Sequence, residues 1–231
     1  MSQEFFSLDW WAYNCTPADA IAYREREAAN FVTVPTVITE LAPGQRSGMD
    51  IFSAHLVTHR TIDITGPIDD MTQKVVTAQL IWLASVGTLP VTIAINSPGG
   101  SVSAGNAIID TMESLQRKGI DVNTRCNGLA ASMAFMILIC GSHKSGQRRS
   151  NYMMHQPLIQ QLGGKATELW EHANKLMDTY RELARTIAEK TGQDYDEVFE
   201  AMKEDKWFDS PEAKAYGVID FIIGIDDLGQ E

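Results

Sequence analysis

Hydrophobic and polar positions alternate between strand-like and helix-like periods from about residue 60 onward. Residues 61–65, 91–95 and 121–126 are short segments rich in β-branched residues, which is typical of buried strands. Apolar residues at helical spacing follow two of them, over residues 75–83 and 104–115. Strands that alternate with helices of this length predict an α/β fold, with a mostly parallel sheet covered by helices.

The last third of the chain is predominantly helical by the same criterion. Residues 166–190 predict one long amphipathic helix with an apolar stripe of Leu169, Ala173, Leu176, Tyr180, Leu183, Ala184 and Ile187. Asp194 is typical of an N-cap, and Ser210 followed by Pro211 predicts the start of another helix. A closing strand is expected over residues 218–225.

The first 30 residues differ from the rest, because aromatic residues cluster beside a charged, alanine-rich stretch. An amphipathic helix, a packed arm and a removable leader all fit this composition. No linker or repeat follows residue 35, so we expect a single unit from there to the end of the chain.

Charge and length then exclude several classes of function. The 231 residues carry 19 Lys and Arg against 30 Asp and Glu, a net charge of −11, which repels nucleic acid and anionic membranes. The longest apolar run, residues 130–140, is far shorter than the roughly 20 residues of a membrane span, which predicts buried core. The N-terminus lacks a basic targeting segment, so we expect a cytoplasmic protein. The three cysteines, Cys15, Cys126 and Cys140, form no CxxC pair and predict neither disulfides nor a zinc site.

Two predicted strand-to-helix junctions carry the residues best suited to chemistry. Gly99 and Gly100 match no nucleotide-binding motif, but their N–H groups could approach a substrate carbonyl and form an oxyanion hole. Ser132 lies among small residues at the next junction, and His155 is the best-placed base for it. From the residues alone, Ser132 also suits a helix cap and His155 a core histidine, and composition cannot choose an acid among 30 candidates. The other histidines form no metal-binding motif.

Five ordered motifs resemble the ClpP family of chambered serine peptidases across residues 34–226. They are the entry segment from Val34-Pro35 to Ser53, Ile95-Asn96-Ser97-Pro98-Gly99-Gly100 with Ala104-Gly105, Gly128-Leu129-Ala130-Ala131-Ser132-Met133, Met154-His155-Gln156-Pro157, and the segment from Asp205 to Ala213. By position, the resemblance implies that Ser132 is the nucleophile, His155 the general base and Asp205 the residue that orients it. It also implies that the backbone N–H groups of Gly100 and Met133 form the oxyanion hole. The order Ser, His, Asp and the missing G-x-S-x-G motif argue against an α/β-hydrolase.

The resemblance further implies a crotonase-like core with a protruding handle helix at residues 166–190. Residues 1–33 would be an N-terminal propeptide or arm, and residues 34–231 the peptidase domain. Such subunits form heptameric rings stacked as a tetradecamer, in some cases mixed with a paralogue, and degrade unfolded polypeptides delivered by a hexameric AAA+ unfoldase. The peptidase itself uses no cofactor, since ATP is consumed by the unfoldase.

Three departures from the family pattern leave alternatives open. Lys203-Glu204 reverses the usual order of an acid and an arginine before the triad aspartate, Lys165 replaces a usual glutamine, and the connection over residues 145–152 is slightly short. The reversed pair motivates a regulatory or non-catalytic subunit that assembles with an active paralogue. An acyl-CoA enzyme of the same fold is a further alternative, because that fold shares the paired N–H groups.

Overall fold

The computed structural model describes residues 36–42, 45–158 and 164–226, and the chain divides into two compact units, residues 1–54 and 55–231. In the first unit, β1 (Thr36–Ala42) and β2 (Gln45–Asp50) form an antiparallel hairpin. The Asp50 carboxylate accepts the backbone N–H groups of Phe52 and Ser53, where α3 (Ile51–His59) begins. The expected domain boundary between residues 33 and 34 lies outside the described residues.

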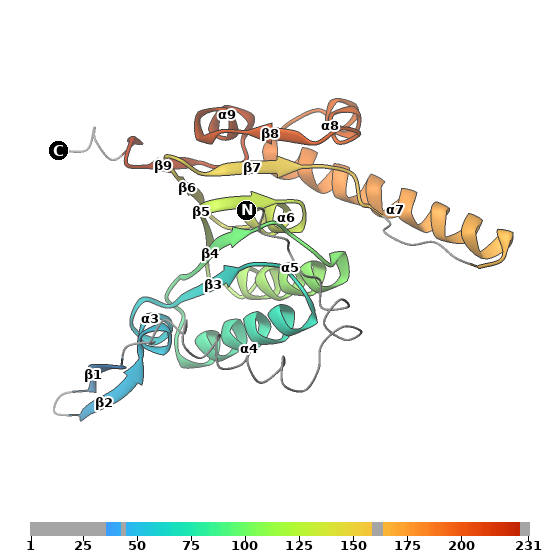
Figure 1. Cartoon of the computed structure of the whole chain (residues 1–231). Helices are drawn as coiled ribbons and strands as arrows, with labels where there is room; N and C mark the ends of the chain where they lie inside the picture. The colour runs from blue at the N-terminus through green and yellow to red at the C-terminus, as the bar shows by residue number, and fades with distance from the viewer. Residues whose placement is uncertain (1–35, 43–44, 159–163, 227–231) are drawn as a thin grey trace, which may run out of the picture. The chain divides into compact units, whose positions relative to one another are not determined.

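The second unit is built on a sheet whose neighbouring strands run parallel along its main path (Figure 1). Helices connect the first four strands of this path, so the predicted α/β fold of βα units is confirmed. The strand order is β3 (Thr61–Thr65), β4 (Val91–Ser97), β5 (Val122–Ala131), β6 (Lys144–Gln147) and β9 (Phe221–Ile223), with α4 (Asp70–Val86), α5 (Val102–Gln116) and α6 (Met133–Ile139) between successive strands.

Strand β5 continues five residues beyond the predicted end at Cys126. The register with β4 shifts there, because Ile95 pairs with Cys126 whereas Ser97 pairs with Ala130. Gly128 therefore marks a bulge instead of the end of a strand. The Asn96 carboxamide oxygen accepts the Leu129 N–H (3.2 Å) inside this bulge. The edge of β5 that pairs with β6 before the bulge pairs with another strand after it.

That strand is β7 (Asn151–Met154), which runs parallel to the end of β5, and β8 (Lys206–Phe208) pairs antiparallel with β7. Neither strand was expected from the sequence. Both have only three or four residues, which is too short for a period of two to be recognised. Their position matters, since they carry the segments next to the predicted base and acid.

The predicted long helix is α7 (Ala166–Thr191), which extends past the end of the sheet (Figure 1). Its C-terminal half packs into the unit, with Tyr180, Leu183, Ala184 and Ile187 buried. Its first half is largely exposed, and the Trp170 side chain is 70% exposed. The apolar stripe predicted along the whole helix is therefore buried in this chain only over its second half, and a protruding helix results.

Capping residues set the ends of the remaining helices. The predicted cap Asp194 accepts the N–H groups of Asp196 and Glu197 at the start of α8 (Tyr195–Ala201). Ser210 is not the cap of α9 (Ser210–Tyr216): Asp209 accepts the Glu212 N–H there. The buried Ser210 hydroxyl instead donates to the Gln147 carbonyl. The closing strand is shorter than predicted, because β9 covers only residues 221–223.

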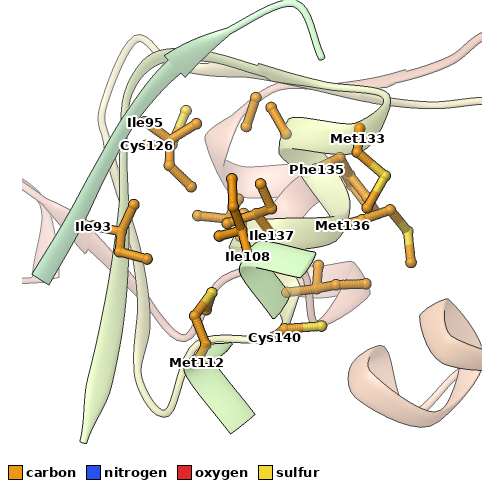
Figure 2. Packing of buried hydrophobic residues seen from close by; sticks show 14 of the residues in the cluster. Ile93, Ile95, Ile108, Met112, Cys126, Met133, Phe135, Met136, Ile137 and Cys140 are labelled. Atoms are coloured by element: carbon orange, nitrogen blue, oxygen red, sulfur yellow. The ribbon is translucent and has the colours of Figure 1, made fainter. Parts of the chain in front are cut away.

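Helix α6 lies at the centre of the core, as its wholly apolar sequence predicts. Figure 2 shows Ile137 of this helix beside Ile108 of α5, in a cluster that also contains Ile93 and Ile95 of β4. All seven residues of α6 are buried. Cys126 and Cys140 are free, buried thiols, and burial raises the pKa of Cys140 to about 11. Cys15 lies outside the described residues. No helix among residues 36–42, 45–158 and 164–226 is long and apolar enough to cross a bilayer.

Candidate active site

Ser132 occupies the junction between β5 and α6 in a conformation that an L-residue seldom adopts. Its φ is 55° and its ψ is −121°, outside the preferred backbone regions. Although Ser132 is the N-cap residue of α6, its side chain makes no capping hydrogen bond. The hydroxyl oxygen lies 2.8 Å from Nε2 of His155 instead. The helix-cap alternative for this side chain is therefore wrong. The strained backbone at Ser132 is typical of residues at functional sites.

His155 follows directly after β7, and Asp205 precedes β8. The register of the antiparallel pair places Met154 opposite Lys206, so His155 and Asp205 are the next opposing positions. His155 Nδ1 lies 3.3 Å from Asp205 Oδ1. The His155 side chain is only 15% exposed, whereas that of Asp205 is 63% exposed. The structure thus brings together a hydroxyl, an imidazole and a carboxylate in hydrogen-bonding succession.

The turn after β4 presents backbone groups that glycine alone can arrange. Ile68 donates its N–H to the Gly99 carbonyl (2.9 Å), and its own carbonyl accepts the Ser101 N–H (2.8 Å). A side chain on Gly100 would collide with the Ile68 carbonyl oxygen. These two bonds flank Gly100, whose N–H has no acceptor among the described residues. A backbone donor is therefore left available on the face of this turn.

A second free donor comes from α6. Met133 is the first residue of that helix, so its N–H has no intrahelical acceptor. Gly99 packs directly against this junction: a Cβ atom on Gly99 would lie 2.7 Å from Ser132 Cβ and 2.8 Å from the Met133 nitrogen. The turn and the helix start are therefore in contact, as an oxyanion hole built from the Gly100 and Met133 N–H groups requires.

A small cavity of about 20 Å³ opens beside Ser132 and His155. Its other walls are apolar and come from helices α6, α7 and α8 and from the ends of β7 and α5. They include the side chains of Met133, Met136, Met154, Leu183, Ile187 and Met202. An apolar substrate side chain suits such walls, and its entry would exclude water from the reacting atoms.

Metal chemistry has no candidate site in the described part of the chain. No group of three or more His, Cys, Asp or Glu side chains there could hold a metal ion. The rings of His55 and His59 lie 5.2 Å apart between centroids and are tilted by 54°, and His55 Nδ1 lies 3.6 Å from an Asp63 carboxylate oxygen. These residues lie in α3 and β3, away from the Ser132 junction in the sequence.

Two features near Asp205 were not expected from the sequence. The Gln156 side chain donates to the Lys203 carbonyl (3.1 Å), a contact that no sequence motif indicates. Lys203, from the reversed Lys203-Glu204 pair, binds both carboxylate oxygens of Glu200 at 2.7 Å within the same chain. The Lys203 side chain is therefore already paired in the single subunit.

Comparisons with known proteins agree with this geometry. Residues 43–226 match the family described as Clp protease. The chain is 40% identical over 194 residues to the ATP-dependent Clp protease proteolytic subunit 2 of Bacillus licheniformis, which covers 83% of this chain and 99% of that protein. It is 37% identical over 204 residues to the ATP-dependent Clp protease proteolytic subunit 1 of Streptomyces coelicolor, which covers 86% of this chain and 90% of that protein.

Proposed function

Because the chain belongs to the Clp protease family of serine peptidases, we propose that it hydrolyses peptide bonds through Ser132, His155 and Asp205. The observation that carries this proposal is the 2.8 Å contact between the Ser132 hydroxyl and His155 Nε2, with Asp205 on the opposite ring nitrogen. A neutral hydroxyl becomes a nucleophile when an adjacent imidazole takes its proton, and a carboxylate on the other ring nitrogen orients that imidazole and stabilises its cation.

In the first half of the reaction, Ser132 Oγ attacks the scissile carbonyl while His155 Nε2 takes the hydroxyl proton. Asp205 holds the imidazole with its Nδ1 protonated and stabilises the cation that forms. The N–H groups of Gly100 and Met133 bind the negative oxygen of the tetrahedral intermediate. The C–N bond then breaks, and His155 passes its proton to the leaving amine, which yields an acyl-enzyme ester on Ser132.

The second half repeats these steps with water. His155 takes a proton from a water molecule, and the resulting hydroxide forms a bond to the ester carbonyl. The second intermediate collapses, the C–O bond to Ser132 breaks, and the proton returns to Oγ. The apolar residues beside Ser132 would contact the side chain on the acyl side of the cleaved bond and thereby help to fix the carbonyl near the two N–H groups.

We further propose a cytoplasmic, ring-shaped assembly, with two heptameric rings enclosing a chamber and a hexameric unfoldase that supplies unfolded chains and consumes the ATP. The exposed first half of α7, with Trp170 at 70% exposure, supports burial of this helix against other subunits. Both relatives are named as proteolytic subunits of an ATP-dependent protease, which supports this division between a peptidase and an unfoldase.

A serine-reactive phosphonate tests the catalytic proposal. Wild-type protein should be labelled at Ser132 and should cleave short fluorogenic peptides, whereas Ser132→Ala should do neither and keep the same native mass. Ser103→Ala is the matched control, because Ser103 is an exposed serine of the neighbouring helix α5. Cleavage by Ser132→Ala at the wild-type rate would contradict the mechanism.

The same experiment separates the alternatives. A regulatory subunit would give no labelling alone and would form rings only when mixed with an active subunit. An acyl-CoA enzyme would still process a thioester substrate after Ser132→Ala. Native mass spectrometry of the wild-type protein reports the subunit number and, in the same measurement, any removal of residues 1–33.

A further inference from the structure

We propose that Gln156 is a positioning residue, which holds the Asp205 loop at the distance that His155 requires. The inference rests on the proposed function and adds a residue to it. Gln156 directly follows His155 in the chain and makes two hydrogen bonds to the segment before Asp205. Its backbone N–H donates to the Met202 carbonyl (2.8 Å), and its side-chain Nε2 donates to the Lys203 carbonyl (3.1 Å).

Asp205 depends on this support because little else holds its side chain. The carboxylate is 63% exposed, and its contact with His155 is long, at 3.3 Å. No other hydrogen bond or ion pair of the Asp205 side chain is found among the described residues. An exposed carboxylate on a short loop can adopt several rotamers. Its distance from the imidazole therefore depends on how firmly the backbone on either side of Asp205 is held.

The backbone after Asp205 is fixed by the β7–β8 pairing, which begins at Lys206. The backbone before it leaves α8 at Met202 and has no such ladder. Gln156 supplies the missing restraint at two successive carbonyls. Since the backbone bond to Met202 persists in any variant, the side-chain bond to Lys203 is the part that mutation can remove.

Other charged groups around the loop are engaged elsewhere or face solvent. Lys203 is bound by Glu200, and Lys206 lies over the ring of Tyr216 at 4.5 Å. Glu204 is exposed. On the side of Ser132, the cavity has no charged side chain other than His155 itself. Asp205 is therefore the charged side chain that contacts the imidazole of His155.

Two variants and one matched control test the proposal. Gln156→Ala removes the side chain, and Gln156→Glu keeps its size but loses the donor at neutral pH. Gln193→Ala is the control, because Gln193 Nε2 also donates to a backbone carbonyl, that of Tyr216 (3.0 Å), outside the site. We expect kcat to fall about tenfold in both Gln156 variants and to stay near the wild-type value in the control.

A double-mutant cycle distinguishes positioning from a general loss of structure. If Gln156 acts by holding the Asp205 loop, Gln156→Ala should cause almost no further loss of kcat in an Asp205→Asn background. A structural defect would add to the Asp205→Asn defect, which would overturn the proposal.

A readout that needs no turnover keeps this inference separate from the proposed function. With the chain's five histidines labelled with ¹⁵N, NMR reports the hydrogen bond between His155 Nδ1 and Asp205, and the signal is assigned with His155→Gln. The Nδ1 signal of a hydrogen-bonded imidazole should be weakened or displaced in Gln156→Ala even if the protein proves inactive. An unchanged signal would overturn the role of Gln156, whereas absent Ser132 labelling with a changed signal would overturn only the catalytic proposal.

Discussion

Gly105 of α5 lies directly against the side chain of Met133, the residue that follows the proposed nucleophile. A Cβ atom on Gly105 would come within 2.6 Å of the Met133 Cε and 2.9 Å of its Sδ. Glycine is otherwise a poor helix residue, so its presence in a buried helix position is explained by this close approach. The Met133 side chain therefore packs into the space that the missing Gly105 side chain leaves on α5.

Gly105→Ala should destabilise the protein although alanine favours helices. Overpacking against Met133 is expected to lower the free energy of unfolding by about 1–3 kcal/mol, which exceeds the stabilisation that alanine gives to a helix relative to glycine. We expect a lower melting temperature and lower kcat. Ser103→Ala on the exposed face of α5 is the control. The loss in the double variant with Met133→Ala should be smaller than the sum of the two single losses, and strict additivity would contradict the contact.

Replacement of Ser132 separates chemistry from backbone strain. Both Ser132→Ala and Ser132→Gly should be inactive, because neither carries the hydroxyl. With φ at 55°, the alanine variant keeps the steric cost of a Cβ atom, whereas glycine does not. Ser132→Gly should therefore be more stable than Ser132→Ala by about 1 kcal/mol, measured by thermal or urea unfolding. Equal stabilities would show that the site stores no strain.

Two glycines with similar backbone angles provide a matched pair. Gly66 has φ of 83° and Gly99 has φ of 92°, but only Gly99 has neighbours that an added Cβ would strike, among them the Ala131 carbonyl oxygen at 2.6 Å. Both alanine variants should lose stability from the positive φ. Gly99→Ala should in addition lose most of its peptidase activity, because the turn must move away from Ser132. Comparable peptidase rates in the two variants would contradict the close packing.

The start of α4 should confer acid sensitivity. The pKa of Asp69 is lowered, chiefly by the hydrogen bond from the Thr72 N–H. A carboxylate with a lowered pKa in the folded state stabilises the fold above its unfolded value of 3.8, and this contribution is lost as the pH falls through the folded value. Asp69→Asn, which keeps a capping oxygen but no charge, should therefore flatten the fall in melting temperature below about pH 4.

Asp69→Ala should lower the melting temperature at neutral pH as well, because it removes the capping oxygen together with the charge. If Asp69→Asn loses stability on acidification as steeply as the wild type, Asp69 is not a source of the effect.

The long elements of this fold could be predicted from the sequence because their periodicity extends over many residues. Helix α4, helix α7 and the strand at Thr61–Thr65 lie where the pattern placed them. Strands β7 and β8 could not be found this way, because they have three or four residues and are stabilised by pairing with distant segments. The extension of β5 was missed because Gly128 indicates a turn locally, whereas in the fold it lies in a bulge.

The sequence predicted only part of the candidate site, because a residue's local neighbourhood does not show which distant residues it meets in the fold. Ser132 and His155 stand out by type and neighbourhood, but the residues alone left a helix cap and a core histidine as alternatives. Only a resemblance to a family singled out Asp205 among 30 acids. Gln156 stands in the motif that carries His155, but its contact with Lys203 gave no signal, because a glutamine that binds a backbone carbonyl 47 residues away has no local pattern.

The antiparallel pairing of β7 and β8 makes hydrolysis depend on the register of these two strands. A slip by a single residue would turn the Asp205 side chain to the other face of the sheet and place Glu204 or Lys206 opposite His155. The succession of Ser132, His155 and Asp205 therefore exists only in the native register of these two strands.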